Sequence, residues 1–239
     1  MKFAVIAAGD GSRLEQEGVA ANKPLVTLAG EPMLDRLLRI FTDAGASEVA
    51  VIVNERMPEV VRHARKMEEE RRTSPCPLRL KVAATPSSMH SFHAISEWLE
   101  DGPFCLTTVD TVFRPDEFNS YIRAFRSGSA DGLMAVTDYV DDERPLYVGT
   151  DGDLNITGFY DNPTGCRYIS GGMYCLTPPA LDTLRRCVAA GQSRMRNFQR
   201  QLVADGLKLK AWPFSKILDV DHAADIAKAE QFLSEIHYE

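Results

Sequence analysis

The stretch KFAVIAAGDGSRL, residues 2–14, decides the fold of this 239-residue chain. Its apolar run, Phe3–Ala8, is continuous and ends at a glycine, which is typical of a strand buried on both faces. Two glycines, a hydroxyl and an arginine follow, and Lys23-Pro24 comes shortly afterwards. A tight turn needs one glycine or an Asn-Gly pair, whereas a loop that wraps its backbone around an anion needs several glycines and a cation. The stretch therefore predicts a strand that leads into a phosphate-binding loop.

Ligands of open α/β sheets gather beyond the carboxyl ends of the strands, which is where this loop stands. Its backbone N–H groups can approach a phosphate closely, and Arg13 and Lys23 would add charge-assisted hydrogen bonds. The loop lacks the G-x-x-x-x-G-K-[ST] pattern of a P-loop, and Glu15 stands near the third glycine of a dinucleotide-binding G-x-G-x-x-G. A dehydrogenase of the Rossmann type is therefore disfavoured, and a plain strand–loop turn is the alternative that the loop alone leaves open.

The net charge of −7 argues against a nucleic-acid or anionic-membrane surface, because either usually demands a basic face. An anionic ligand must then be held locally, by a loop or a metal ion. The five cysteines are odd in number and form no C-x-x-C pair, so we expect reduced thiols and neither a zinc site nor a disulfide framework. Six apolar residues after Lys2 are too few for a secretory signal, and no window approaches the roughly 18 apolar residues of a membrane span. We expect a cytoplasmic protein.

Buried runs and helical spacings alternate through the first part of the chain, at roughly 25–30 residues per unit. Such a βαβαβαβ pattern predicts a parallel, doubly wound sheet with right-handed crossovers. Strands are expected at Phe3–Ala8, Glu48–Val53, Leu80–Ala84, Phe104–Val109 and Gly132–Thr137, with helices at Met33–Ala44, Pro58–Arg72, Phe92–Leu99 and Phe118–Phe125.

Past residue 138 the rhythm changes, and a turn signal, TDGDLN (150–155), predicts a hairpin. The expected elements are strands at Tyr147–Val148, Ile156–Tyr160, Gly172–Leu176 and Leu207–Trp212, and helices at about 179–190, 194–205 and 223–236. No linker or repeat interrupts the chain. The prediction is one α/β domain, residues 1–239, with a Rossmann-like, mostly parallel mixed sheet and helices on both of its faces.

Four motifs give this chain a resemblance to a known superfamily. AAGDGSRL (7–14) followed by KPLVTLAGEPMLDRLL (23–38) resembles the L-A-A-G-x-G-x-R-L … P-K-P-L-x-x-x-x-G-x-P pattern of the sugar-1-phosphate nucleotidyltransferases, or NDP-sugar pyrophosphorylases, and their relatives. TTVDTVF (107–113), SGGMY (170–174) and LDVDHAAD (218–225) resemble the superfamily's later landmarks, in the same order. Asn22 stands where the first proline is usual, which should change the stiffness of the loop more than its chemistry.

The resemblance implies attack of a phosphate oxygen on the α-phosphorus of a nucleoside triphosphate, with Mg²⁺ as cofactor. Asp110 and Asp221 would hold the Mg²⁺, and Asp219 is the alternative because residues two apart on a strand share a face. Arg13 and Lys23 would take the triphosphate as the catalytic cations. Each of the two aspartates could instead be an ordinary helix N-cap. Arg13 and Lys23 could instead be ordinary surface residues. The expected nucleotide-binding residues are Ala7, Ala8, Gly9, Gly11, Ser12, Ser88 and Ser91.

The segment TPSSMHSFHA (85–94) departs from the hexose-1-phosphate enzymes, in which a glycine that reads the base stands at the position of His90. It is more similar to the N-N-x-x-S-L segment of phosphocholine cytidylyltransferases, with Ser88 and Ser91 offering hydroxyls. His90 and His93 are open to two readings: a base or metal pair, or capping and packing residues of a first helical turn.

A second departure concerns the acceptor. The sugar enzymes carry E-K-P, whose lysine binds the sugar phosphate, whereas this chain has DNP (161–163). Arg167 or Lys216 would have to replace that lysine. The expected acceptor-binding residues are Gly172, Asn162, Arg167 and Lys216, in an acceptor-binding half (139–239) with a closing helix that follows the nucleotide-binding half (1–138).

The sequence thus predicts a Mg²⁺-dependent nucleotidyltransferase that joins an NTP to a phosphorylated small molecule and releases pyrophosphate. The alternatives are a cytidylyltransferase for a small phosphoalcohol such as phosphocholine, a molybdopterin-type (MobA-like) nucleotidyltransferase, and a non-catalytic nucleotide-binding regulatory protein. Retention of Arg13, Lys23, Asp110 and Asp221 argues against the last. The base, the acceptor and the choice between monomer and homodimer stay open.

Overall fold

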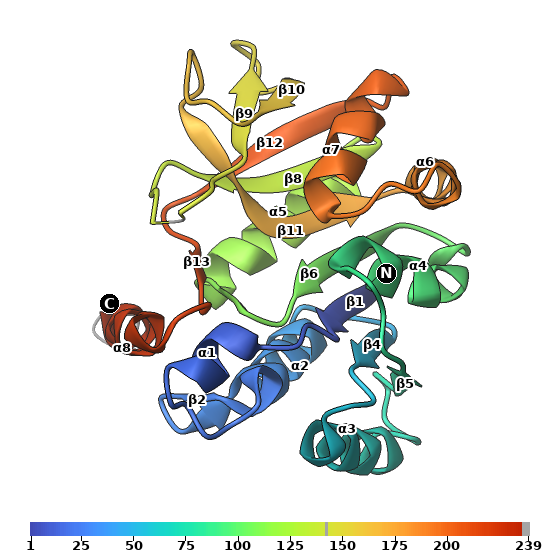
Figure 1. Ribbon diagram of the computed structural model, residues 1–239. Coiled ribbons are helices and arrows are strands. Elements are labelled where there is room, and N and C mark those ends of the chain that lie inside the picture. Colours follow the sequence, from blue (N-terminus) through green and yellow to red (C-terminus); the bar gives the residue numbers. More distant parts are fainter. Residues whose placement is uncertain (142, 236–239) are drawn as a thin grey trace.

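A computed structural model describes residues 1–141 and 143–235, and nine strands among them form one sheet with helices packed on both faces (Figure 1). The strands of this sheet are β1 (Lys2–Ala7), β4 (Val49–Val53), β5 (Leu78–Val82), β6 (Phe104–Thr108), β8 (Gly132–Thr137), β9 (Tyr147–Thr150), β10 (Ile156–Tyr160), β11 (Tyr168–Leu176) and β12 (Leu209–Phe214). They run in the order β10-β9-β11-β6-β1-β4-β5, and β8 pairs with both β11 and β12.

The sheet is mixed, as the sequence predicts. Strand β1 pairs in parallel with β4 and β6, and β4 pairs in parallel with β5. Strand β11 is antiparallel to both β6 and β8, and β12 returns parallel to β8. The parallel strands predicted up to Thr137 are not all neighbours, however. The crossover between β6 and β8 passes over one strand position, which β11 fills from much later in the chain.

Helices cover the sheet because its strands are apolar on both faces. Phe3 and Val5 of β1 point to the layer of α2 (Met33–Asp43), α3 (Pro58–Glu70) and α5 (Pro115–Ser127), where Phe3 meets the ring of Phe41 at 4.9 Å. Ala4 and Ile6 point to the opposite layer, formed by α4 (Ser88–Ile95), α6 (Pro179–Ala189) and α7 (Met195–Ala204). No helix in the described part of the chain combines the length and apolar character needed to cross a membrane.

Several boundaries differ from the predicted ones. Helix α4 begins at Ser88, four residues before the prediction, because the Ser87 hydroxyl accepts a hydrogen bond from the His90 N–H. The remainder of the predicted helix, Ser96–Leu99, tightens into a 3-10 turn. Strands β5 and β12 are each displaced by two residues, and Pro115 rather than Phe118 opens α5. The predicted end of the last helix, residue 236, lies outside the described residues.

The C-terminal helix, α8 (Ala223–Glu235), packs beside the N-terminal segment that contains α1 (Ser12–Gln16), the 3-10 turn η1 (Lys23–Leu25) and the small hairpin of β2 (Thr27–Leu28) and β3 (Glu31–Pro32) (Figure 1). Just before α8, β13 (Leu218–Asp219) pairs with β7 (Thr111–Val112), and the Val220 N–H donates to the Asp110 carbonyl at 3.0 Å. This pairing brings the acidic motif of residues 219–221 next to the carboxyl end of β6.

Candidate active site

A cleft of about 800 Å³ opens beyond the carboxyl ends of β1, β4 and β6. Every nucleotide-binding, catalytic and metal-binding residue predicted from the sequence lies in its wall, except the alternative ligand Asp219. These residues are Ala7, Ala8, Gly9, Gly11, Ser12, Arg13, Lys23, Ser88, Ser91, Asp110 and Asp221. Segments separated by as many as 200 residues of sequence thus meet at one place.

Glycine occurs at positions 9 and 11 of the loop for different structural reasons. Gly11 has a φ of +62°, and a Cβ on it would lie 3.1 Å from the Cβ of Lys23. Its left-handed backbone and the close approach of Lys23 therefore favour glycine at this position. A Cβ on Gly9 would meet nothing of the protein within 4 Å, although Gly9 lines the cleft. The packing of the described residues therefore does not require glycine at position 9, and a side chain there would project toward the cleft.

Alanine substitutions should separate these two reasons. Gly9→Ala is expected to leave the melting temperature unchanged and, if the cleft binds a nucleotide as the sequence predicts, to raise the KM for it about tenfold, because its methyl group would project into the cleft. Gly11→Ala is expected to lower the free energy of unfolding by about 1 kcal/mol, from the left-handed backbone alone. Thermal melts and nucleotide titrations of both variants check this. A destabilised Gly9→Ala protein would contradict it.

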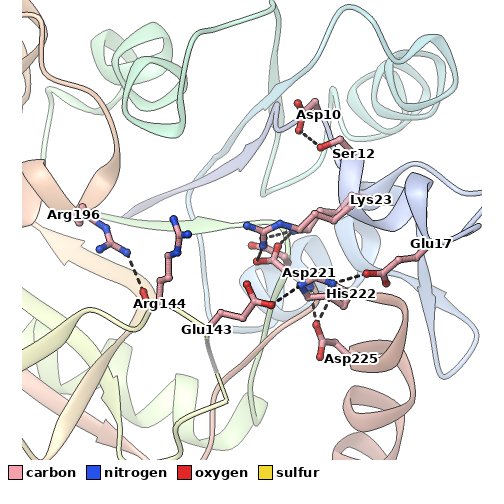
Figure 2. A network of polar contacts seen from close by, with 12 residues as sticks. Asp10, Ser12, Glu17, Lys23, Glu143, Arg144, Arg196, Asp221, His222 and Asp225 are labelled. Atoms are coloured by element: carbon pink, nitrogen blue, oxygen red, sulfur yellow. Dashed lines mark hydrogen bonds and ion pairs between the residues drawn. The ribbon is translucent and has the colours of Figure 1, made fainter. Parts of the chain in front are cut away.

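The charged side chains of the cleft form one network (Figure 2). The Lys23 ammonium lies 2.6 Å from Oδ2 of Asp110 and 2.5 Å from Oδ1 of Asp221. Nη1 of Arg13 contacts the second oxygen of Asp221 at 3.0 Å. Burial acts to lower the pKa of Lys23, but the two carboxylates outweigh it and raise that pKa above its ordinary value. Burial likewise acts to raise the pKa of Asp110, and the Lys23 charge overcomes it, so this carboxyl stays ionised.

The donor set of the cleft fits a magnesium ion. Mg²⁺ binds through one or two carboxylates and completes its shell with waters and substrate phosphates, and Asp110 and Asp221 supply such carboxylates. Oδ1 of Asp110 is buried and has no hydrogen-bond partner, so one acceptor atom is available to a cation. Within residues 1–141 and 143–235, no three or more His, Cys, Asp or Glu side chains are arranged to enclose a metal ion. Asp110 and Asp221 both line the cleft.

Asp219, the alternative ligand, lies in β13 and lines a neighbouring recess. Asp219 is solvent-exposed, yet loss of hydration of its carboxyl among the neighbouring residues and the negative charges of Asp110 and Asp221 raise the pKa of that carboxyl. The carboxylate of Asp219 is therefore close enough to interact electrostatically with Asp110 and Asp221, but it lines the recess and not the cleft. Asp110 and Asp221 are therefore the carboxylate pair that faces the cleft.

A set of hydrogen bonds not anticipated from the sequence fixes the backbone around Asp221 (Figure 2). Oδ2 of Asp225 accepts from the N–H groups of Asp221 and His222 at 3.2 and 2.8 Å. The carboxylate of Glu17, which directly follows α1, accepts from Nδ1 of His222 and from the Ala223 N–H, each at 2.6 Å. Glu17 thus joins the phosphate-loop segment to the start of α8.

Loss of this link should loosen Asp221. Glu17→Gln is expected to raise the Mg²⁺ concentration for half-maximal activity about tenfold, the usual effect of removing a group that orients a metal ligand. Glu15→Gln, at an exposed glutamate in α1, the helix that Glu17 directly follows, is the matched control and should leave this concentration unchanged. A magnesium titration of the activity checks both. An equal effect of the two variants would show that Glu17 does not position Asp221.

Hydroxyl groups gather where the base would lie. Thr85 Oγ1 and Ser91 Oγ are 2.6 Å apart, and Ser88 also lines the cleft. Nδ1 of His90 is hydrogen-bonded to the hydroxyl of Ser87, the N-cap residue of α4, at 2.9 Å. Neither His90 nor His93 is among the residues that line the cleft. Sequence reasoning missed Asn54, whose amide donates to the Ala8 carbonyl at 3.1 Å, and Arg56, which lines the cleft.

A recess of about 340 Å³ adjoins the cleft and shares Arg13 and Asp221 with it. The four predicted acceptor residues are not among the described residues that line this recess. Asn162 is exposed, Arg167 pairs with Asp138 at 3.2 Å, and the Lys216 ammonium lies 4.4 Å from the centre of the Tyr139 ring. Gly172 has a φ of +73°, and a Cβ on it would lie 3.1 Å from Thr111 Oγ1, so it packs against β7.

The fold and the cleft together define an α/β nucleotide-binding protein with an acidic, cation-paired site at the carboxyl edge of its sheet. Comparison with protein families gives a match to the MobA-like NTP transferase domain over residues 3–205. The chain therefore belongs to the family of MobA-like NTP transferase domains. The predicted resemblance to the nucleotidyltransferase superfamily is confirmed, and the matching family is the MobA-like branch.

Two characterised relatives are similar in sequence. The CMP-5'-(3-aminopropyl)phosphonate synthase of Streptomyces rubellomurinus is 27% identical over 253 residues, which cover 92% of this chain and 36% of that protein. The mannose-1-phosphate guanyltransferase of Schizosaccharomyces pombe is 24% identical over 194 residues, covering 77% of this chain and 52% of that protein. The chain thus spans between about a third and a half of the length of these relatives.

Solved structures share the fold over nearly their whole length. The inositol-1-phosphate CTP transferase from T. maritima matches with a TM-score of 0.79 and 18% identity, covering 99% of this chain and 96% of that chain. A protein from Bacillus anthracis assigned as a glucose-1-phosphate thymidylyltransferase matches with a TM-score of 0.85 and 16% identity, covering 100% and 97%. At these identities the likeness concerns the fold alone.

Proposed function

We propose that this protein transfers a nucleoside monophosphate from an NTP to a small phosphorylated acceptor and releases pyrophosphate. One observation carries the proposal: Arg13, Lys23, Asp110 and Asp221 converge, with mutual contacts of 3.0 Å or less, in the cleft where an α/β sheet binds its ligand. Membership of the NTP transferase family agrees with it. Residues 1–138 would bind the nucleotide, and residues 139–239 would supply most of the acceptor side.

The residues of the cleft are suited to hold charge in place. Arg13 and Lys23 would bind the β- and γ-phosphates that leave as pyrophosphate, and the backbone at Gly9 would lie against the nucleotide. An acceptor phosphate oxygen attacks the α-phosphorus; a P–O bond forms, the bond to the β-phosphate oxygen breaks, and its electron pair leaves with pyrophosphate. The attacking oxygen is already anionic, so positioning and neutralisation suffice without a general base.

Asp110 and Asp221 are the residues that would hold Mg²⁺, with Asp219 as the nearby substitute. When bound, the ion supplies positive charge to the phosphate oxygens and helps to orient them. The protein's own part is to keep both carboxylates ionised and fixed, through Lys23 on one side and through Asp225 and Glu17 on the other.

A cytidylyltransferase for a phosphonate or a small phosphoalcohol such as phosphocholine is the second candidate. The observation in its favour is that the hydroxyl-bearing residues Ser88 and Ser91, at the start of α4, line the cleft. A relative with a cytidine nucleotide in its name, the CMP-5'-(3-aminopropyl)phosphonate synthase, points the same way. The two candidates share the reaction and differ only in base and acceptor.

Pyrophosphate release tests the proposal. The protein is mixed with Mg²⁺, each of the four NTPs or dTTP, and an acceptor panel: mannose-1-phosphate, glucose-1-phosphate, inositol-1-phosphate, 3-aminopropylphosphonate and phosphocholine. Release with one pair names both substrates. If no pair reacts while Mg-NTP still raises the melting temperature, the result favours a non-catalytic nucleotide-binding protein over a transferase for these acceptors. If no Mg-NTP raises it, the nucleotide assignment itself is wrong.

A further inference from the structure

The cleft has two ends that differ in chemistry. Asp110, which follows β6, and the ammonium of Lys23 lie at one end. The other end is lined by Asn54, Arg56 and residues 84–88, which follow β4 and β5. Neighbouring strands are about 4.8 Å apart, so β6 and β4, on either side of β1, are separated by about 10 Å. Because the cleft extends in this direction, a triphosphate held at the first end would place its nucleoside over the ends of β4 and β5.

One charged side chain, that of Arg56, stands at this second end among the described residues that line it. The other lining residues of this end, Asn54, Ser91 and residues 84–88, are uncharged. Arg56 is exposed, and its side chain makes no hydrogen bond or ion pair within the part of the chain that the structure describes. The N–H donors of its guanidinium are therefore available to a ligand in the cleft.

The backbone of Arg56 is fixed to the centre of the sheet through Asn54. The Asn54 side chain is buried, and its amide donates to the Ala8 carbonyl at 3.1 Å, while its Oδ1 accepts from the Arg56 N–H at 3.0 Å. Ala8 directly follows β1, so these two hydrogen bonds hold the turn at Arg56 against the start of the glycine loop. Asn54 is therefore a positioning residue, and Arg56 has less backbone freedom to lose when a ligand binds.

We propose that Arg56 hydrogen-bonds to the nucleobase and selects a base with two neighbouring acceptors, an assignment that rests on the proposed transferase function. A guanidinium can donate two parallel hydrogen bonds to such a pair. Guanine offers O6 and N7, and cytosine offers O2 and N3. Adenine carries its amino group beside both N1 and N7, and uracil and thymine carry N3–H between their two carbonyl oxygens, so each of these bases accepts one such bond. Arg56 is thus a specificity-determining residue that favours guanine or cytosine nucleotides.

Nucleotide binding without turnover tests this assignment. The α,β-methylene analogues of GTP, CTP, ATP, UTP and dTTP are titrated into the protein with Mg²⁺, and each Kd is measured by calorimetry. The wild-type protein is expected to bind the guanine or the cytosine analogue at least about tenfold more tightly than the adenine, uracil and thymine analogues. Arg56→Ala should weaken the preferred analogue at least about tenfold and change the disfavoured ones by less than about twofold. Arg56→Lys should be intermediate, because one point charge replaces the fork of donors.

Arg62→Ala is the matched control. Arg62 is an exposed arginine of α3 outside the cleft, so its loss changes the net charge equally and should leave every Kd unchanged. Deaza nucleotides give a second measurement that does not depend on the folding of a variant. If guanine is preferred, 7-deaza-GTP, which lacks N7, should bind the wild type at least about tenfold more weakly than GTP. If cytosine is preferred, 3-deaza-CTP, which lacks N3, should show the same loss relative to CTP.

The possible results separate the assignment from the function on which it rests. Equal binding of all bases by the wild type, a preference for adenine, uracil or thymine, or a preference that survives in Arg56→Ala overturns the assignment. A uniform loss for all bases in Arg56→Ala, or a deaza nucleotide that binds as tightly as its parent, overturns it as well. If no nucleotide analogue binds at all, the proposed function itself is wrong.

Discussion

Asp110→Asn is expected to reduce pyrophosphate release at least about 1,000-fold, the largest effect of any single substitution in this protein. The amide keeps the shape of the carboxylate but removes its charge, so the proposed magnesium site loses a ligand worth several kcal/mol at the transition state, and each 1.36 kcal/mol is a factor of ten in rate. The partnerless oxygen of Asp110 is the atom whose loss matters most. Steady-state pyrophosphate assays over a range of Mg²⁺ concentrations measure the effect.

A thermal melt keeps this result interpretable. Asp110 also pairs with Lys23, but Lys23 retains Asp221 in the variant, so the protein should remain folded. Asp116→Asn, on the first turn of α5 and outside the cleft, is the control and should be fully active. A folded Asp110→Asn protein with wild-type activity would show that this carboxylate takes no part in the reaction.

Lys23→Met is expected to damage both stability and activity. Lys23 has only 13% of its side chain exposed and separates two carboxylates, which would face each other without it. Breaking such a pair costs about 3 kcal/mol of unfolding free energy, because it leaves uncompensated charge in a shielded place. The kcat/KM should fall about 100-fold as the triphosphate loses a cation.

Magnesium distinguishes this explanation from a simple packing defect. In EDTA the Lys23→Met protein should show the full loss of stability, and millimolar Mg²⁺ should recover part of it, because the ion brings positive charge to the same two carboxylates. Lys66→Met, at a lysine with 74% of its side chain exposed, should be neutral in both conditions. Denaturant unfolding with and without Mg²⁺ measures this. A loss of stability that Mg²⁺ does not change would contradict the proposed metal site.

The parts of this fold that the sequence predicts are those with a local signal. The buried run of β1, the glycine loop and the helical spacing of α2 each occupy a few consecutive residues, and the structure has them within one or two residues. Arg13 and Asp110 share one cleft because they follow the parallel strands β1 and β6, whose carboxyl ends meet at one edge of the sheet. Lys23 reaches the cleft through the 3-10 turn η1, and Asp221 through the antiparallel pairing of β13 with β7.

The parts that the sequence does not predict depend on pairings across the chain. Strand β11 pairs with β6 and β8 through contacts between residues that lie about 30 to 70 positions apart, which no local periodicity can signal. The Glu17–His222 contact joins residues 205 positions apart. On the acceptor side, Arg167 contacts Asp138 and Lys216 contacts the Tyr139 ring, contacts across the chain that motif position does not predict.

The most direct test of the central claim follows the two ends of the triphosphate separately. The protein is incubated with Mg²⁺, the acceptor panel and an NTP labelled with ³²P at either the α- or the γ-position, and the products are separated. Nucleotidyl transfer predicts that the α-label appears in an acceptor-linked product and the γ-label in pyrophosphate. Appearance of the γ-label on an acceptor, or release of the α-label as free nucleotide regardless of the acceptor, would contradict the account.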